Sequence, residues 1–188
     1  LINRQNPDIV LIPGDFVDED YIFKEDLSEL RTIKAKVYYS YGNHETYLKT
    51  DVEKELSSYN ITFLRNKSIE FDKKLTIIGA DDNFNKLNAS LSNIKIDKNN
   101  YNLLMNHQPT GVDIANKKNI DLMVSGHTHN GQIFPFNYLV KSRYEYIKGL
   151  YEYEGTKLFV TTGTGTWGPK MRLGSDNELV IITLKPQK

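Results

Sequence analysis

Short apolar runs alternate with longer amphipathic stretches over the first sixty residues. The runs at residues 8–12 and 37–41 are apolar and are closed by Pro or Gly, which is typical of buried strands. Residues 23–33 and 45–59 repeat apolar side chains at helical spacing, with charged residues between them. The pattern predicts strand, helix, strand and helix in that order.

The spacing of apolar residues changes after residue 60. Asp72 and its two following lysines mark a turn between short β-type runs. Strands are expected at residues 62–64, 68–71, 75–79, 101–105 and 120–124, with tail runs at 144–153, 157–162 and 179–184. Helices are expected at residues 89–94 and 112–117. We predict that residues 1–188 form a single domain of the α/β (α+β) class, with two packed sheets flanked by helices.

The beginning of the chain lacks an initiator methionine. Leu1 and Ile2, followed by polar residues and Pro7, resemble the last turn of a helix that leads into a strand. We therefore expect the chain to be N-terminally truncated, so that the missing targeting or membrane segment says nothing about the parent protein.

Composition narrows the function classes. Lys+Arg and Asp+Glu are both 24, so the formal net charge is +0, which argues against general nucleic-acid binding. No apolar run approaches the roughly 20 residues that span a bilayer. The chain has 0 cysteines, which excludes disulfides and thiolate ligands and leaves the redox compartment open.

All four histidines and one carboxylate come just after predicted strands. Asp15, His44 and His107 each follow a different run, and His127 and His129 follow a fourth. Ligands of α/β sheets bind beyond the carboxyl ends of the strands. Imidazole with oxygen donors suits Mn, Fe, Co or Zn, so the pattern predicts a metal site.

Each of these residues also has an ordinary structural role. Asp15 suits a turn after glycine, Asp18 an N-cap, and Asn43 a left-handed turn position. A lone histidine in a loop is more often a surface residue than a ligand. The grouping of these residues at strand ends favours the metal site.

The ordered motifs resemble the calcineurin-like metallophosphoesterase superfamily, and in particular its bacterial branch of small, often membrane-associated phosphodiesterases. The resemblance rests on Gly14-Asp15-Phe16-Val17-Asp18, Gly42-Asn43-His44-Glu45, Asn106-His107 and Gly126-His127-Thr128-His129, and is extended by Gly149-Leu150-Tyr151, residues 162–167 and Arg172-Leu173-Gly174.

The resemblance implies a two-sheet sandwich (αββα) with a dinuclear metal site. Asp15 would bridge the metals, with Asn43, His107 and His127 completing one site and His129 belonging to the other. His44, oriented by Asp18, would protonate the leaving oxygen while a metal-bound hydroxide attacks phosphorus.

The superfamily also has an Asp-x-His block after its first strand, and this chain has none. A strand and part of a helix, on the order of 30 residues, would precede Leu1. We expect two metals in the full-length protein but one or none in this chain, with weak or no activity. The missing strand would leave a sheet edge through which chains can self-associate.

The predicted function is therefore hydrolysis of a phosphodiester or phosphomonoester. The alternatives are a phosphatase or nucleotide pyrophosphatase of the same superfamily, or a non-catalytic metal-binding scaffold. Arg172 is a candidate for binding an anionic substrate, with a solvated basic pair of Lys170 and Arg172 as the alternative. Substrate identity stays open between small-molecule and lipid or cell-wall phosphoesters. Localisation also stays open: membrane-associated through an upstream segment, or otherwise cytoplasmic.

Overall fold

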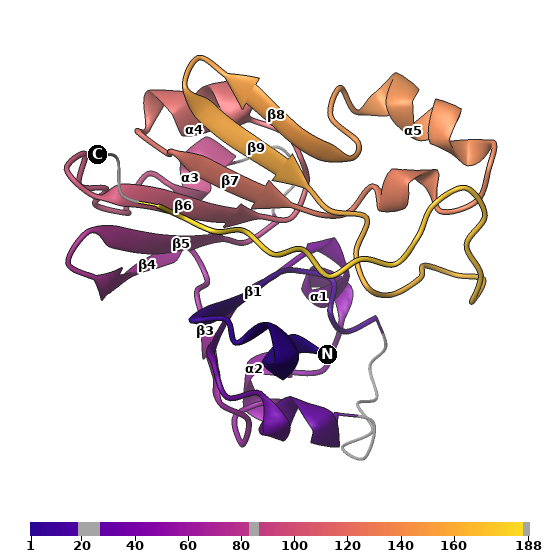
Figure 1. Cartoon of the computed structure of the whole chain (residues 1–188), viewed down its shortest axis with the longest axis horizontal. Helices are drawn as coiled ribbons and strands as arrows, with labels where there is room; N and C mark the ends of the chain where they lie inside the picture. Colours follow the sequence, from indigo (N-terminus) through magenta and orange to yellow (C-terminus); the bar gives the residue numbers. More distant parts are fainter. Residues whose placement is uncertain (19–26, 83–86, 186–188) are drawn as a thin grey trace.

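Two β-sheets form the centre of the computed structural model, which describes residues 1–18, 27–82 and 87–185 (Figure 1). The smaller sheet has the order β1-β2-β3 and all its strands are parallel. Its strands are β1 (Ile9–Pro13), β2 (Lys36–Ser40) and β3 (Ile61–Phe63).

The larger sheet has six strands in the order β4-β5-β6-β7-β9-β8. Strands β5, β6, β7 and β9 are parallel to one another, while β4 and β8 pair antiparallel at the two edges. Its members are β4 (Lys67–Asp72), β5 (Leu75–Ala80), β6 (Tyr101–Asn106), β7 (Leu122–Ser125), β8 (Gly149–Tyr153) and β9 (Thr156–Val160).

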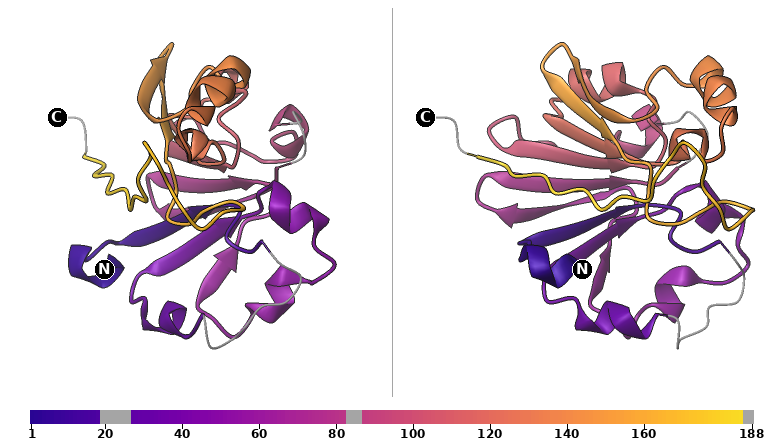
Figure 2. Two further views of the ribbon diagram at one scale, coloured as in Figure 1. Left: turned by 90° about the vertical axis from the view of Figure 1, so that its right-hand side faces the viewer. Right: turned by 45° about the vertical axis from the view of Figure 1, so that its right-hand side comes forward.

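The sheets pack face to face over an apolar core. Tyr38 of the small sheet lies in one buried cluster with Ile77, Leu103 and Met105 of the large sheet. The outer face of the large sheet is covered by α3 (Leu87–Ser90) and α4 (Val112–Lys117). The outer face of the small sheet packs against α2 (Val52–Glu55), while α1 (Asn43–Tyr47) begins just beyond the carboxyl end of β2. The turned views show helices of this part of the chain on the side away from the large sheet (Figure 2). The predicted architecture of two sheets flanked by helices is confirmed.

Two predicted helices differ from those observed. The stretch at 45–59 is two short helices, because Asp51 accepts a hydrogen bond from the Lys54 amide at 3.1 Å and starts a new helix. Residues 23–26 of the predicted 23–33 helix lie outside the described residues, and the rest contains a 3₁₀ turn at Ser28–Thr32.

In the C-terminal half, one observed helix was not predicted, and one predicted strand has no counterpart among the described residues. Helix α5 (Phe136–Arg143) was not predicted, and none of its residues is buried, so no core-facing stripe marks it in the sequence. The strand predicted at 179–184 is wrong: this segment has no strand assignment and no ladder among the described residues. An apolar alternation becomes a strand only when a neighbouring strand supplies hydrogen bonds. The run at 144–153 shortens to β8.

None of the described helices is both long enough and apolar enough to cross a membrane.

Candidate metal centre

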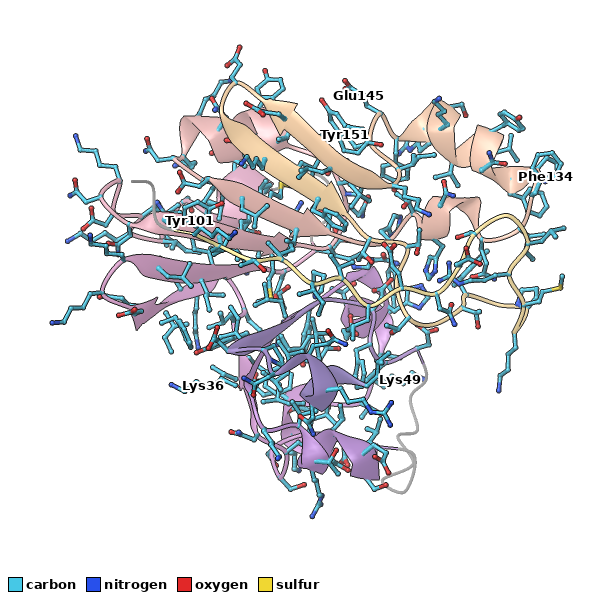
Figure 3. The ribbon with its side chains drawn as sticks, viewed as in Figure 1. Lys36, Lys49, Tyr101, Phe134, Glu145 and Tyr151 are labelled. Atoms are coloured by element: carbon cyan, nitrogen blue, oxygen red, sulfur yellow. The ribbon has the colours of Figure 1, made fainter. Side chains whose placement is uncertain are left out.

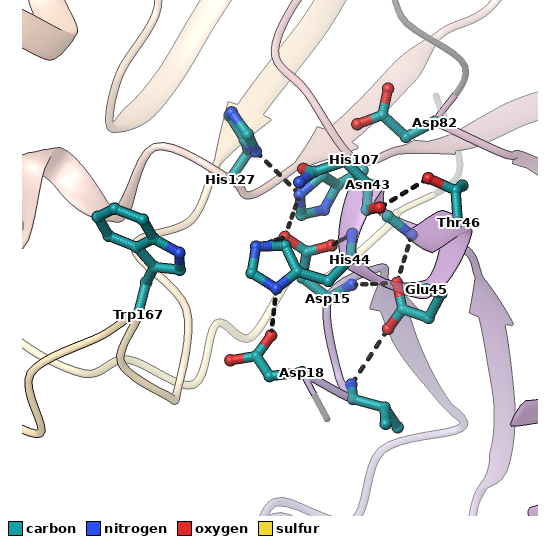
Figure 4. A network of polar contacts seen from close by, with 12 residues as sticks. Asp15, Asp18, Asn43, His44, Glu45, Thr46, Asp82, His107, His127 and Trp167 are labelled. Atoms are coloured by element: carbon teal, nitrogen blue, oxygen red, sulfur yellow. Dashed lines mark hydrogen bonds and ion pairs between the residues drawn. The ribbon is translucent and has the colours of Figure 1, made fainter. Parts of the chain in front are cut away.

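Four loops meet at the carboxyl ends of β1, β2, β6 and β7, and they carry the residues singled out in the sequence (Figure 4). Asp15 follows β1, and Asn43 and His44 open α1 after β2. His107 directly follows β6, and His127 lies two residues beyond β7. Parallel strands within each sheet, and the packing of one sheet on the other, therefore bring distant parts of the chain to one place.

Two glycines allow the first two loops to approach closely. Gly14 has φ +91, and a Cβ at this position would collide with the backbone of Gly42. A Cβ on Gly42 would in turn collide with the Asp15 carboxylate. A side chain at Gly14 would displace the Gly42 backbone, and one at Gly42 would displace Asp15.

A buried carboxylate, Glu45, joins the same two loops. It accepts hydrogen bonds from the amides of Asp15 (2.9 Å), Phe16 (2.8 Å), Val17 (3.1 Å) and Gly42 (2.8 Å). The Tyr39 hydroxyl also donates to it. Burial and the Glu45 charge raise the pKa of Tyr39, which keeps this donor protonated.

Asp15, His107 and His127 form the centre of the site. Asp15 Oδ2 lies 2.8 Å from His107 Nε2, which lies 3.1 Å from His127 Nδ1. One ligand atom from each of the three lies within 4.8 Å of the other two, a spacing that can hold a metal ion.

The charges of these groups depend on one another. Burial alone would raise the pKa of Asp15, but the hydrogen bond and charge of His107 outweigh it and lower that pKa. Burial works against protonation of His107 as well, yet Asp15 raises its pKa. Burial, together with the neighbouring His107, lowers the pKa of His127 to about 4. His127 is therefore neutral at pH 7, as a metal ligand must be.

The outer nitrogens of both imidazoles are held by neighbours. His107 Nδ1 lies 2.9 Å from the Pro13 carbonyl, to which it donates. His127 Nε2 lies 2.9 Å from the Tyr144 hydroxyl. These contacts leave His107 Nε2 and His127 Nδ1 pointing at the centre, an arrangement common around protein metal ions.

Asn43 supplies the observation that tests the fit of a metal. Its Oδ1 is buried, and it has no hydrogen-bond partner among the described residues. A buried amide oxygen without a partner costs about 1–3 kcal/mol, so such atoms usually have a ligand. With Asp15, His107 and His127, this oxygen would complete a mixed N/O donor set of the kind that suits a divalent transition metal.

His44 lies beside the centre and is held by a second carboxylate. Its Nδ1 is 2.7 Å from Asp18 Oδ1, while its Nε2 faces Asp15 Oδ2 at 3.7 Å. Its backbone amide donates to Asp15 Oδ1 at 2.9 Å. Burial raises the pKa of Asp18, and the adjacent His44 opposes that rise.

His129 lies apart from the three-residue centre. Its Nδ1 is 3.1 Å from Arg172 Nη2, and burial, followed by the Arg172 charge, lowers the pKa of His129 to about 4. Arg172 also donates to Thr162 O (2.7 Å), Ser175 Oγ (3.0 Å) and the Gly165 carbonyl. The guanidinium thus fixes the His129 loop, and its predicted contact with substrate stays a prediction.

This geometry agrees with the comparison with known proteins. The sequence profile of calcineurin-like phosphoesterases matches residues 1–131. The chain belongs to that family. Membership of this family implies the use of divalent metal. The candidate ligands in this chain include Asp15, His107 and His127.

Relatives from distant organisms match nearly the whole chain. An uncharacterised metallophosphoesterase of Campylobacter jejuni is 35% identical over 100% of this chain and 53% of its own length. One from Aquifex aeolicus is 33% identical over 97% of the chain and 74% of its own length. A Bos taurus transmembrane protein with metallophosphoesterase domain is 30% identical over 98% of the chain and 47% of its own length.

The calcineurin-like phosphoesterase chain spans about half the length of the Campylobacter relative. A solved structure with 13% identity superposes with a TM-score of 0.52 over 84% of this chain and 80% of its own, which supports the fold.

Several residues of the centre were not identified from the sequence. No role was predicted for Glu45, although a carboxylate directly after Asn43-His44 could have indicated one. Gln108, Asp82 and Tyr144 form a hydrogen-bonded chain to His127. Nothing in sequence spacing places Tyr144 against His127.

Proposed function

We propose that this calcineurin-like phosphoesterase is a metal-dependent hydrolase of phosphoesters. Asn43 Oδ1, beside the Asp15–His107–His127 centre (Figure 4), carries the proposal: it is buried and has no hydrogen-bond partner within the described part of the chain. A scaffold that only binds a protein partner has no need for an oriented His44 next to such a centre.

Asp15, Asn43, His107 and His127 would hold one divalent ion, with His129 and Asp15 contributing to a second. Such ions supply Lewis-acid stabilisation of negative phosphoryl oxygens and a water nucleophile at neutral pH. The identity of the metal is left open among Mn, Fe, Zn and Co. Neutral His127 and His129, with their lowered pKa values, are ready to bind a cation without losing a proton.

His44 is the proposed proton donor. Its Nδ1 is engaged by Asp18 at 2.7 Å, which leaves Nε2 directed into the site. As the oxygen of water bonds to phosphorus and one proton of that water is lost to solvent, the bond from phosphorus to the leaving oxygen breaks. The Nε2 proton of His44 then passes to that leaving oxygen, and Asp18 stabilises the ring while it carries the proton.

The substrate class favoured is a phosphodiester, with a phosphomonoester as the alternative. The lipid or cell-wall phosphoesters expected from the sequence stay within this proposal, as does membrane association of the parent protein, since a similar protein is named a transmembrane protein. Parallel assays with bis-p-nitrophenyl phosphate and p-nitrophenyl phosphate separate the two classes. Turnover of neither compound, with metal bound, would favour the scaffold.

The role of His44 gives the test. His44→Ala should lower kcat by roughly 10²–10⁴-fold, the usual contribution of a general acid, and leave metal content unchanged. Lys49→Ala, on an exposed neighbour, is the matched control for handling and folding. Loss of metal from His44→Ala would make His44 a ligand and remove it as proton donor.

A further inference from the structure

Helix α5 and the loop after β9 expose an unusual number of large apolar side chains. Seven of them are between 51% and 65% exposed: Phe134, Phe136, Tyr138, Leu139, Trp167, Met171 and Leu173. We call these seven residues the α5 face. Figure 3 shows Phe134 at the outer edge of the molecule, pointing away from both sheets.

The two segments that form this face are joined by hydrogen bonds. Phe134 N donates to the Leu173 carbonyl at 2.7 Å, and Leu173 N donates to Gln132 O at 2.9 Å. The Gln132 side chain accepts from Trp167 N at 2.7 Å and donates to Trp167 O at 2.8 Å. The two segments therefore lie side by side, and Figures 1 and 2 place both on the same side of the molecule.

The charge of these segments differs from that of the whole chain. Acidic and basic residues balance at 24 each overall. No Asp or Glu occurs at residues 122–144 or 155–175, which contribute the exposed Lys141, Arg143 and Lys170. Asp176 and Glu178, which follow this loop, lie near Arg172 and act on its charge rather than on Lys141, Arg143 or Lys170. An exposed apolar face that carries these three exposed cations is complementary to an anionic, partly apolar surface.

We propose that the α5 face binds the headgroup region of anionic lipid bilayers. Tyr and Trp side chains favour the boundary between headgroups and acyl chains, while Phe and Leu enter slightly deeper. Lysines can lie along an apolar surface with their ammonium groups at the phosphates. A protein partner would more often meet a face that carries both signs of charge.

The α5 face also borders the candidate metal centre. The close view draws Trp167 to one side of His44 and His127 (Figure 4), and Arg172 of the same loop contacts His129. Binding through this face would place the centre next to lipid headgroups, a step that rests on the proposed function. Membrane binding itself is measured without turnover, so it stands or falls separately from hydrolysis.

Trp167 makes the test specific, because it is the only tryptophan among the 188 residues. The chain is mixed with vesicles of phosphatidylcholine, alone or containing phosphatidylglycerol. We expect co-sedimentation and a blue-shifted Trp167 emission with the anionic vesicles only. High salt should weaken the binding, because it screens charges beyond a few ångströms.

Substitutions on α5 separate the two contributions. Lys141→Gln should weaken vesicle binding roughly fivefold, the effect of one lysine near an anionic surface. Leu139→Gln should weaken it roughly tenfold through lost apolar burial. The matched controls Lys73→Gln and Leu150→Gln should bind like the unaltered chain, since Leu150 is 62% exposed but lies on β8.

Three results would overturn the proposal. The first is no binding to anionic vesicles by a chain whose circular dichroism shows it folded. The second is equal binding by the α5 variants and their controls. The third is a concentration-dependent dimer in sedimentation velocity that Leu139→Gln abolishes without vesicles, which would assign the face to a second copy of the chain.

Discussion

Tyr144 shows how a single side chain can prepare a metal ligand. Its hydroxyl donates to Gln108 Oε1 at 2.9 Å, and Gln108 Nε2 donates to Asp82 Oδ2 at 2.8 Å. Since the only hydroxyl proton of Tyr144 goes to Gln108, its oxygen accepts from His127 Nε2–H, 2.9 Å away. The lone pair of His127 is then on Nδ1, facing the centre.

Tyr144→Phe should therefore weaken metal binding roughly tenfold, the lower end of the effect of losing an outer partner of a ligand. The fold should be retained, because the ring still packs against His127. Titration calorimetry with Mn²⁺ measures the change, with Tyr138→Phe, on an exposed tyrosine of α5, as the control. Unchanged affinity would show that Tyr144 does not set the His127 tautomer.

The residues at strand ends could be predicted from the sequence, whereas their partners could not. His107 and His127 follow short apolar runs that are evident in the sequence. Tyr144 and Gln108 meet His127 only because β6 and β7 pair in parallel and the chain after α5 returns to them. Such contacts depend on tertiary packing that periodicity does not encode.

At the scale of elements, Glu45 connects the loop after β1 to the start of α1. Four backbone amides and the Tyr39 hydroxyl donate to one carboxylate that is 4% exposed. The loops that carry Asp15 and Asn43 are thereby held in one arrangement, independently of any ligand.

Glu45→Gln should lower the free energy of unfolding by about 3 kcal/mol, because the amide places N–H donors against backbone N–H groups. Urea denaturation measures this change, with exposed Glu53→Gln of α2 as the control. We also expect weaker Mn²⁺ binding, since Asp15 loses its support. A variant as stable as the control would mean that Glu45 does not organise these loops.

Local sequence signals predict only some of the boundaries of the helices and strands. The strands of both sheets were predicted within a few residues because their apolar runs are short and sharply ended. The break before α2 depends on the capping side chain of Asp51, and α5 has no buried side at all. Segment 179–184 has the alternation of a strand but no partner strand beside it among the described residues.

For the molecule as a whole, the site histidines couple stability to pH. Burial lowers the pKa of His127 and His129 to about 4, so between their ordinary value of 6.5 and about 4 the unfolded chain binds protons that the folded chain excludes. His107, with its raised pKa, and Asp15, with its lowered pKa, keep the same charge in both states across this window.

The metal-free chain should therefore lose stability as pH falls from 6.5 to 4, on the order of 2 kcal/mol after allowance for partial solvent access. Urea denaturation in chelator at several pH values measures the slope, and His129→Gln should reduce it. Stability that rises as the pH is lowered through this window would contradict the assignment of buried neutral histidines.

Sheet packing brings Asp15, His107 and His127 together, so the central claim is that they hold a metal with Asn43. The most direct test is Mn²⁺ titration of the chain alongside Asn43→Ala, with exposed Asn60→Ala as the matched control. The account predicts one tightly bound ion per chain, with affinity unchanged in Asn60→Ala and weakened at least roughly tenfold in Asn43→Ala, because Asn43 Oδ1 is a proposed ligand. No bound ion, or equal affinity in Asn43→Ala and the unaltered chain, would contradict it.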